Sequence, residues 1–295
     1  MKIVIALLLT ALFSTVSVSQ GNHDLSRLIA TEAEFIQVAG DIGPKKAFLK
    51  FLAPDAVLFQ PQAVNGHEYW NRRVDKANEL LVRKAIYADI SANGLLGYTT
   101  GNWRLYDKGK SESSATYGQY ATIWERSPEG GYRATLDISI EHDKLPFTET
   151  DRIIRVDAKR DLNKRGWSPA DASMNFLRKS MLGSVRLGGA YEEFAAKDVR
   201  LLLAREAPIL GKKKVVREMN RYLAVEFPTK ITAFQSADLA YTWNPCRFTN
   251  NEEGFENGNC LHIWKLRDKK WWIVLGVFAP IPNDKPPVLK GVSRR

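Results

Sequence analysis

The sequence predicts an α+β protein built from two tandem cone-shaped domains, in which N-terminal helices pack on a strongly curved, mainly antiparallel sheet. Three observations predict this fold class. One pattern of residues occurs twice, each copy begins with apolar residues at helical spacing, and each copy ends in alternating runs rich in β-branched and aromatic residues. Helices followed by a meander of strands are typical of α+β domains.

The repeat is clearest where strands are expected. Tyr98 and Tyr241 open matching segments and lie 143 positions apart, whereas Trp124 and Trp264 lie 140 positions apart. Both the order of the residues and their chemistry recur. The small drift in spacing places the insertions and deletions in the loops between strands.

In the first copy, the segment 24–38 carries a broad apolar stripe at helical spacing, and Asp24 is its candidate N-cap. A second helix is expected over 45–52 after a Gly-Pro break, and a short strand over 56–60 ends at Pro61. Three further strand-like runs follow, separated by Gly-rich or charged turns.

In the second copy, Ser168 and Pro169 offer a cap and a first-turn proline for a helix that extends to about Met181. The segment 191–196 then stands where the second helix stands in the first copy. Three strand-like runs follow again. The segment 143–167 between the copies is either a linker or a final strand of the first copy.

The N-terminus has the three zones of a secretory signal peptide, namely Lys2, the apolar run 3–13 and the small-residue stretch 14–19, with cleavage expected after Ser19. The apolar run is well short of the ~20 residues that a membrane-spanning helix needs, so no stable membrane anchor is expected. The mature protein is expected in the periplasm or outside the cell. The resulting division of the chain is residues 1–19 as signal peptide, 22–142 as the first domain, 143–167 as linker or final strand, 168–282 as a degenerate second domain and 283–295 as a basic tail.

Charge narrows the class of partner. The chain has 43 Lys and Arg against 33 Asp and Glu, a net charge of +10. Acidic residues are interspersed with the basic ones, and most aromatic residues lie in strand-like runs, so no nucleic-acid binding is expected. The tightest basic cluster, Lys212 to Lys214, follows Gly211 and is expected in a solvated turn. Anionic surfaces remain an alternative partner.

Cys246 and Cys260 are the only two cysteines, and export would place them where a disulfide persists. If the flanking segments pair as a hairpin, a bond between them would staple its loop. A structural disulfide is the favoured interpretation. Two free thiols are the alternative, because strand register could keep the side chains apart.

Several stretches of the first copy resemble one known superfamily. They are the segment 48–61, the Val64-Asn65-Gly66 motif, the run 120–124 and the Leu136-Asp137 pair. Together they are similar to the SnoaL-like, nuclear transport factor 2-like (NTF2-like) superfamily, which also holds ketosteroid isomerases and polyketide cyclases. The resemblance covers 24–142 and, more weakly, 168–280. It implies cones in which helices close one side of a curved sheet around a pocket.

The resemblance also implies where an isomerase base would lie. Isomerases of this superfamily carry a catalytic Asp just before a proline at the end of the first strand. The matching residue here is Gln60, and an amide cannot take up a proton at physiological pH. The second copy has Leu202 and Leu203 in this region. Isomerase chemistry by that mechanism is therefore not expected in either domain.

Polar residues inside apolar strands are the candidates for a pocket, because pockets display a few orienting groups on an apolar wall. Asp137 is the candidate acid or base, with His67 or Tyr98 as its partner. Gly276 replaces Asp137 in the second copy, which favours the first domain as the active one. The candidate ligand-binding residues are Gln60, Tyr98, Tyr120, Thr122, Trp124, Asp137 and His262.

Each candidate also has a structural interpretation. Asp137 could face solvent or bind a backbone amide, and a lone buried His262 is more often structural than catalytic. Trp124 is expected to pack between the two copies, because Trp264 is its counterpart. The four histidines lack metal-ligand spacing and no Gly-rich phosphate loop occurs, so neither a metal nor another cofactor is expected.

The leading functional hypothesis is a secreted, non-catalytic module whose copies pack as an internal pseudo-dimer, and which binds a small apolar or aromatic molecule or serves a structural role. One alternative is an enzyme of the cyclase, isomerase or dehydratase type that uses Asp137. A second alternative is a binder of anionic surfaces or of a protein partner. The first two differ in whether Asp137 points into a closed cavity within reach of another titratable group.

Overall fold

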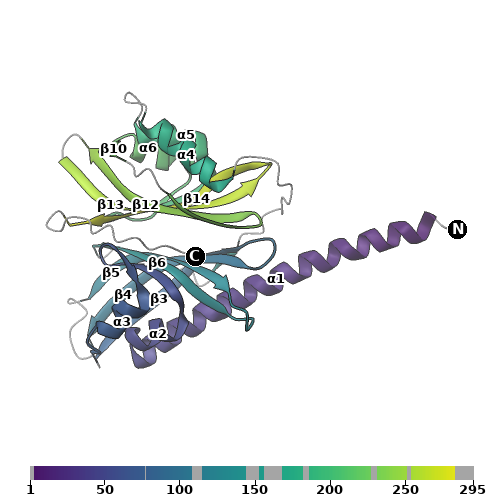
Figure 1. Cartoon of the computed structure of the whole chain (residues 1–295), viewed down its shortest axis with the longest axis horizontal. Coiled ribbons are helices and arrows are strands. Elements are labelled where there is room, and N and C mark those ends of the chain that lie inside the picture. Colours follow the sequence, from purple (N-terminus) through teal and green to yellow (C-terminus); the bar gives the residue numbers. More distant parts are fainter. Residues whose placement is uncertain are drawn as a thin grey trace.

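Two curved sheets, each with its own helices, make up the protein (Figure 1). The computed structural model describes residues 3–76, 78–107, 115–143, 153–155, 168–181, 186–226, 231–250 and 254–282. Each half has helices ahead of a mixed, mainly antiparallel sheet. The predicted tandem α+β fold is therefore confirmed.

The first domain begins with helix α1 (Ile3–Ile42), followed by α2 (Pro44–Phe51) and α3 (Gly66–Arg72). Helix α1 starts well before Asp24, so the predicted N-cap is wrong. The Asp24 carboxylate instead contacts Arg126 at 3.3 Å. Among the residues whose side chains are described, no helix is long and apolar enough to cross a membrane.

The first sheet has the strand order β2-β1-β6-β5-β4-β3-β7. Strand β1 is parallel to β6 and β7 is parallel to β3, whereas the other neighbours are antiparallel. Strand β7 lies in the segment predicted as linker or final strand, most of which lies outside the described residues. The strands are β1 (Leu52–Phe59), β2 (Ala63–Asn65), β3 (Glu79–Ile90), β4 (Leu96–Asp107), β5 (Thr116–Arg126), β6 (Tyr132–His142) and β7 (Ile154–Arg155).

The second domain repeats this plan. Helix α4 begins as predicted, because the hydroxyl and backbone amide of Ser168 exchange hydrogen bonds with Asp171 at the helix start. Lys212 to Lys214 lie in helix α6, so the predicted solvated turn is wrong. The elements are α4 (Pro169–Met181), α5 (Leu187–Phe194), β8 (Ala195–Leu203), β9 (Ile209–Leu210), α6 (Lys212–Met219), β10 (Leu223–Glu226), β11 (Thr232–Ser236), β12 (Leu239–Asn250), β13 (Gly254–Arg267) and β14 (Lys270–Ile281).

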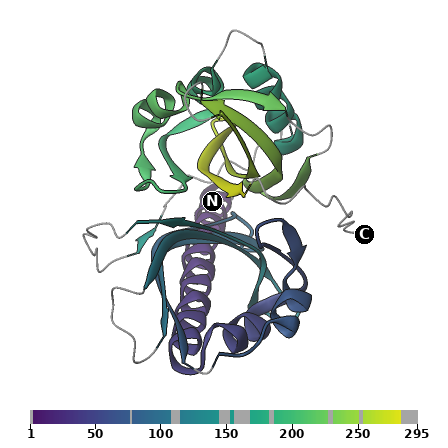
Figure 2. The same cartoon turned by 90° about the vertical axis from the view of Figure 1, so that its left-hand side faces the viewer.

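The two sheets pack face to face, with the helices of each domain on the outer sides (Figures 1 and 2). One buried apolar cluster joins both sheets and includes Ile123 and Ile138 from the first and Leu261 and Val277 from the second. Phe59 also meets Trp243 across this boundary. Each sheet therefore has one face against its own helices and the other against its neighbour.

Candidate functional site

Asp137 on β6 forms a buried ion pair with Arg83 on β3. Two guanidinium nitrogens of Arg83 donate to the two carboxylate oxygens at 2.8 and 2.9 Å, and the Thr122 hydroxyl donates to Oδ2 at 2.6 Å. Thr122 lies directly opposite Asp137 in the register of β5 and β6. The Asp137 side chain is only 6% exposed. Both carboxylate oxygens are thus held by partners from the chain itself.

Aromatic rings surround the guanidinium group of Arg83. Its central carbon lies 4.3 Å from the ring centre of Tyr120, 5.0 Å from that of Phe35 and 5.1 Å from that of Phe48. Cations over aromatic faces are attracted by the ring quadrupole, more strongly when water is absent. Arg83 therefore occupies the interior between the helices and the first sheet, where the family resemblance implies a pocket.

Glu32 of α1 is a second interior carboxylate, which the sequence analysis missed. It is fully buried and accepts hydrogen bonds from the hydroxyls of Thr99 and Tyr120, each at 2.7 Å. Burial raises the pKa of Glu32, and the nearby Arg83 charge opposes this change. The indole of Trp124 extends the network by donating to the Thr99 hydroxyl at 2.9 Å.

Glu32 and Arg83 were not predicted as site residues, but the periodicity of the sequence points to both. Glu32 follows Leu28 by four positions and precedes Phe35 by three, so it lies on the apolar stripe of its helix. Arg83 lies on the same buried face of β3 as Leu81 and Ala85, two positions from each. A charged residue at a core position is the signal in each case.

The three predicted catalytic residues do not come together. Tyr98 belongs to the apolar cluster between the sheets, on the opposite face from Asp137, and stacks on Tyr87. His67 of α3 makes a hydrogen bond of 3.3 Å with the Leu52 carbonyl oxygen. No hydrogen bond or ion pair of the described residues joins Asp137 to His67 or Tyr98. The predicted pairing of Asp137 with Tyr98 is therefore wrong, because the two side chains lie on opposite faces of the sheet. The pairing with His67 stays a prediction.

The remaining first-domain candidates divide into two groups. Tyr120, Thr122 and Trp124 alternate along β5 and all contribute to the interior network. The prediction that Trp124 packs between the copies is wrong, because its ring meets Phe35 of α1 inside the first domain. Gln60 is exposed and accepts a hydrogen bond of 3.3 Å from Tyr69, away from this network.

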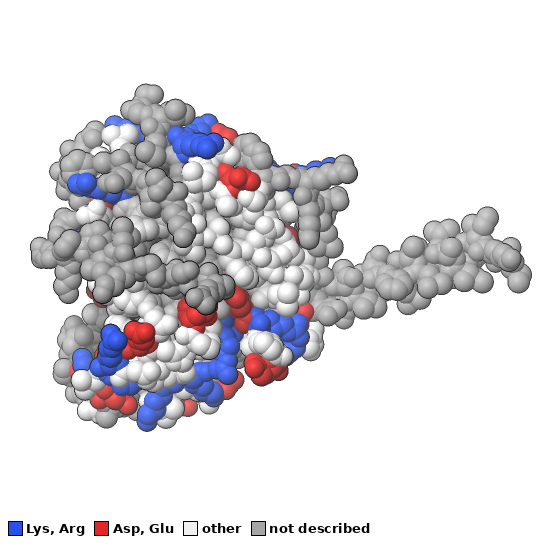
Figure 3. Space-filling view, viewed as in Figure 1, with Lys and Arg blue, Asp and Glu red and all other residues white. Residues whose placement is uncertain are grey.

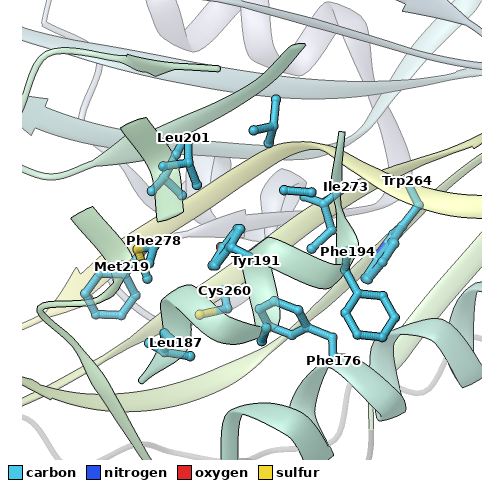
Figure 4. Close-up of a cluster of buried hydrophobic side chains, with 14 of the residues drawn as sticks. Phe176, Leu187, Tyr191, Phe194, Leu201, Met219, Cys260, Trp264, Ile273 and Phe278 are labelled. Carbon is cyan, nitrogen blue, oxygen red and sulfur yellow. The ribbon is translucent and has the colours of Figure 1, made fainter. Parts of the chain in front are cut away.

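His262 lies in the interior of the second domain, at the position that Thr122 has in the first. Its Nε2 is 3.0 Å from the Tyr191 hydroxyl, and its ring packs edge-on against Phe176 and Trp264. Figure 4 shows the apolar cluster in which Tyr191, Phe176 and Trp264 lie. Burial lowers the pKa of His262 to about 4, so the ring is neutral at physiological pH.

Gly276 confirms the correspondence between the copies at atomic level. It pairs with His262, as Asp137 pairs with Thr122. A Cβ atom on Gly276 would lie 3.1 Å from the Tyr191 hydroxyl and 3.0 Å from Leu201. The tyrosine and histidine thus fill the space that a carboxylate takes in the first domain. The second domain has a neutral pair where the first has an ion pair.

Cys246 and Cys260 form a disulfide within the second domain, with their Cα atoms 6.0 Å apart. Cys260 lies opposite Asn244 in the β12–β13 hairpin, so the bond joins diagonal neighbours on the two strands. Both cysteines belong to the buried apolar cluster of the domain. The bond therefore lies inside the protein, on the face of the sheet that packs against the helices of its own domain.

We expect His262 to make the protein less stable in acid. The unfolded chain takes up a proton on this histidine near pH 6.5, but the folded chain does so only near pH 4, so stability is lost as the pH falls between these values. Each pKa unit is worth about 1.4 kcal/mol, which gives a loss of about 3 kcal/mol. Urea unfolding at pH 7 and pH 4 should show this extra loss in the wild type relative to His262→Gln. Equal losses in the two proteins would contradict the prediction.

Among the described residues, no three His, Cys, Asp or Glu side chains gather as metal ligands would.

The visible face of the first domain mixes basic and acidic side chains (Figure 3). By sequence, the span 22–142 has 14 Lys and Arg against 15 Asp and Glu, whereas 168–282 has 17 against 12. The excess positive charge therefore lies outside the first domain.

The architecture is the tandem α+β fold that the sequence predicts. No protein-family model matches the chain, and no curated protein matches its sequence. Solved structures similar to it include an NTF2-like protein from Cytophaga hutchinsonii ATCC 33406, with 14% identity, a TM-score of 0.32 and coverage of 39% of this chain and 100% of that one. A ketosteroid isomerase-like protein from Erwinia carotovora atroseptica SCRI1043 has 15% identity and a TM-score of 0.33, with coverage of 38% of this chain and 92% of that one. A protein of unknown function with a cystatin-like fold from Nostoc punctiforme PCC 73102 has 13% identity and a TM-score of 0.32, with coverage of 40% of this chain and 96% of that one.

Proposed function

We propose that this chain is an exported, non-catalytic protein in which two NTF2-like domains form one structural unit through their packed sheets. The pairing of Asp137 with Arg83 is the observation that carries this proposal. A general acid or base must exchange a proton with a substrate that it can reach. Both oxygens of Asp137 instead accept hydrogen bonds from buried donors of the chain. The acid that the sequence offers for the enzymatic alternative is therefore a structural ion-pair partner. Glu32, the second interior carboxylate, likewise accepts hydrogen bonds from Thr99 and Tyr120 of the chain itself.

The second domain supports the same function. Its interior holds a neutral histidine bonded to Tyr191 and has a glycine at the position of Asp137. Neither group can replace the missing acid. Export is supported by the signal-like segment 1–19 and by the buried disulfide, because disulfides persist mainly in oxidising compartments.

Native mass spectrometry of the protein purified from its own host under mild conditions tests this proposal. We expect the mass of a single chain that begins at Gln20, less two hydrogen atoms for the disulfide, with no small molecule bound. A single chain is expected because the sheet faces are already covered within the molecule. A chain that keeps residues 1–19 would contradict export and leave the structural role standing.

A stoichiometric small molecule would contradict the structural role. The variant Arg83→Met with Asp137→Leu would then locate it, because it replaces the ion pair by apolar side chains of similar volume. Loss of the molecule from this variant, but not from Gln60→Ala at the exposed candidate, would assign it to the interior of the first domain.

A further inference from the structure

Three charged side chains meet in the buried boundary between the two domains. Lys265 of β13 places its ammonium group 3.2 Å from Asp89 Oδ1 of β3 and 3.3 Å from Asp238 Oδ2, which lies between β11 and β12. None of the three side chains is more than 2% exposed. We call these residues the interdomain charge cluster.

Backbone groups of the first domain complete the contacts. The Lys265 ammonium donates to the Ile90 carbonyl oxygen at 2.9 Å, and the Ala92 amide donates to Asp238 Oδ1 at 2.7 Å. The Ile90 amide donates to Asp89 Oδ1 at 2.7 Å. The cluster therefore ties the β3–β4 connection of one domain to the β11–β12 connection of the other.

The cluster carries more negative than positive charge when both carboxyl groups are ionised. Two carboxylates face one ammonium group, and Asp89 Oδ2 accepts no hydrogen bond from the described residues. A buried charge without compensation is costly, and proteins commonly avoid the cost by neutralising the group. Protonation of either carboxyl group would leave the Lys265 ammonium paired with one carboxylate, so the net charge of the cluster would be zero.

The other charged and titratable groups nearby do not remove this imbalance. Arg267 is held by Asp198, with contacts of 2.7 and 3.1 Å, at a partly exposed site. Arg200 lies over the ring of Tyr87, 5.7 Å from its centre. The phenols of Tyr87 and Tyr98 are neutral, because burial raises the pKa of both.

Asp89 is the carboxyl group with the stronger reason to hold the proton. Asp238 divides its contacts between its two oxygens, because Oδ1 accepts the Ala92 amide and Oδ2 lies 3.3 Å from the ammonium group, although without a hydrogen bond. Asp89 has both of its contacts, with the Ile90 amide and the ammonium group, on Oδ1, and its Oδ2 has neither. Burial raises the pKa of Asp89, and the Lys265 charge opposes this only in part.

We propose that the boundary between the two domains holds a proton on the Asp89 carboxyl group, which makes the packing of the domains dependent on pH. The folded protein then binds one proton more than the unfolded chain between the ordinary pKa of Asp and the raised value. The stabilisation from this proton is complete below the ordinary pKa and is lost as the pH rises through the raised one. A rise in pH through the raised pKa therefore loosens the boundary.

The variant Asp89→Asn tests the proposal, because an amide resembles the protonated carboxyl group and keeps an acceptor for the Ile90 amide. Urea unfolding should be measured from pH 5 to pH 9 for the wild type, this variant and the control Asp198→Asn at the partly exposed pair. We expect the stability of Asp89→Asn, relative to the wild type, to rise with pH. The change in the unfolding equilibrium constant is about tenfold for each unit by which the pKa of Asp89 is raised. Parallel curves, or a relative stability that falls with pH, would overturn the proposal.

A direct reading of the proton keeps the test decisive if the variant folds poorly. In wild-type protein with ¹³C-labelled Asp carboxyl groups, NMR at pH 5 should show a signal at the shift of a protonated carboxyl group, because an ordinary Asp is ionised at that pH. This signal should move to the ionised shift only as the pH rises further, and it should persist in Asp198→Asn. Ionised shifts for every Asp carboxyl group at pH 5 to 7 would rule out the proton.

Discussion

Asp137→Ala is expected to lower the free energy of unfolding by about 3 to 5 kcal/mol, the range observed when one partner of a buried ion pair is removed. The variant leaves the Arg83 guanidinium inside the first domain without its bidentate acceptor. It also removes the acceptor of the Thr122 hydroxyl. Urea unfolding at pH 7, followed by circular dichroism, measures the loss.

Two comparisons separate the ion pair from a general effect of truncation. Asp198→Ala breaks a partly exposed pair with Arg267, and pairs of that kind are worth about 0 to 1 kcal/mol. The double variant Arg83→Met with Asp137→Leu removes both charges and should recover most of the loss, because no buried charge is left unpaired. A double variant as unstable as Asp137→Ala would show that the pair itself is not the source.

The repeat pattern predicted much of the fold, because it depends on residue types that recur at nearly constant spacing. Trp124 and Trp264 donate to Thr99 and Thr242 in the same way, at 2.9 and 2.8 Å. Such equivalence could be predicted because each copy must bury the same face of its strands. The helix that begins after Ser168 followed from local capping chemistry alone.

The face on which Tyr98 lies could not be predicted in the same way. Successive strand residues point to opposite sides, so one residue of register decides whether Tyr98 or Thr99 faces the helices. The register of β4 against β5 places Thr99 opposite Thr122, and Tyr98 therefore faces the second domain.

Arg83 and Glu32 were missed for a different reason. Arginine and glutamate are mostly exposed in proteins, so their occurrence within an apolar pattern is easily taken for a solvent-facing position. Their burial depends on partners from distant segments, since Asp137 lies 54 positions after Arg83 and Tyr120 lies 88 positions after Glu32. The candidate site could therefore be located by its apolar strands, but the pairing that neutralises it required the three-dimensional structure.

Replacement of both Cys246 and Cys260 by alanine is expected to lower the free energy of unfolding by about 3 kcal/mol. The bond closes a loop between residues 14 positions apart, and a loop of this size restricts the unfolded chain by about that amount. The same urea measurement under non-reducing conditions gives the difference. A loss below about 1 kcal/mol would show that the hairpin is held without the bond.

The structural position of the bond explains why this loss should concern the whole second domain. In the first domain, the matching positions hold Trp103 and Tyr120, two large side chains that fill the inner face. In the second domain, two cysteines joined by the disulfide stand in place of these larger side chains. The unfolding transition of the helices α4 to α6 should therefore shift together with that of the hairpin in the alanine variant. A local change at the hairpin, with hydrogen exchange of the helices unaltered, would limit the bond to the β12–β13 connection.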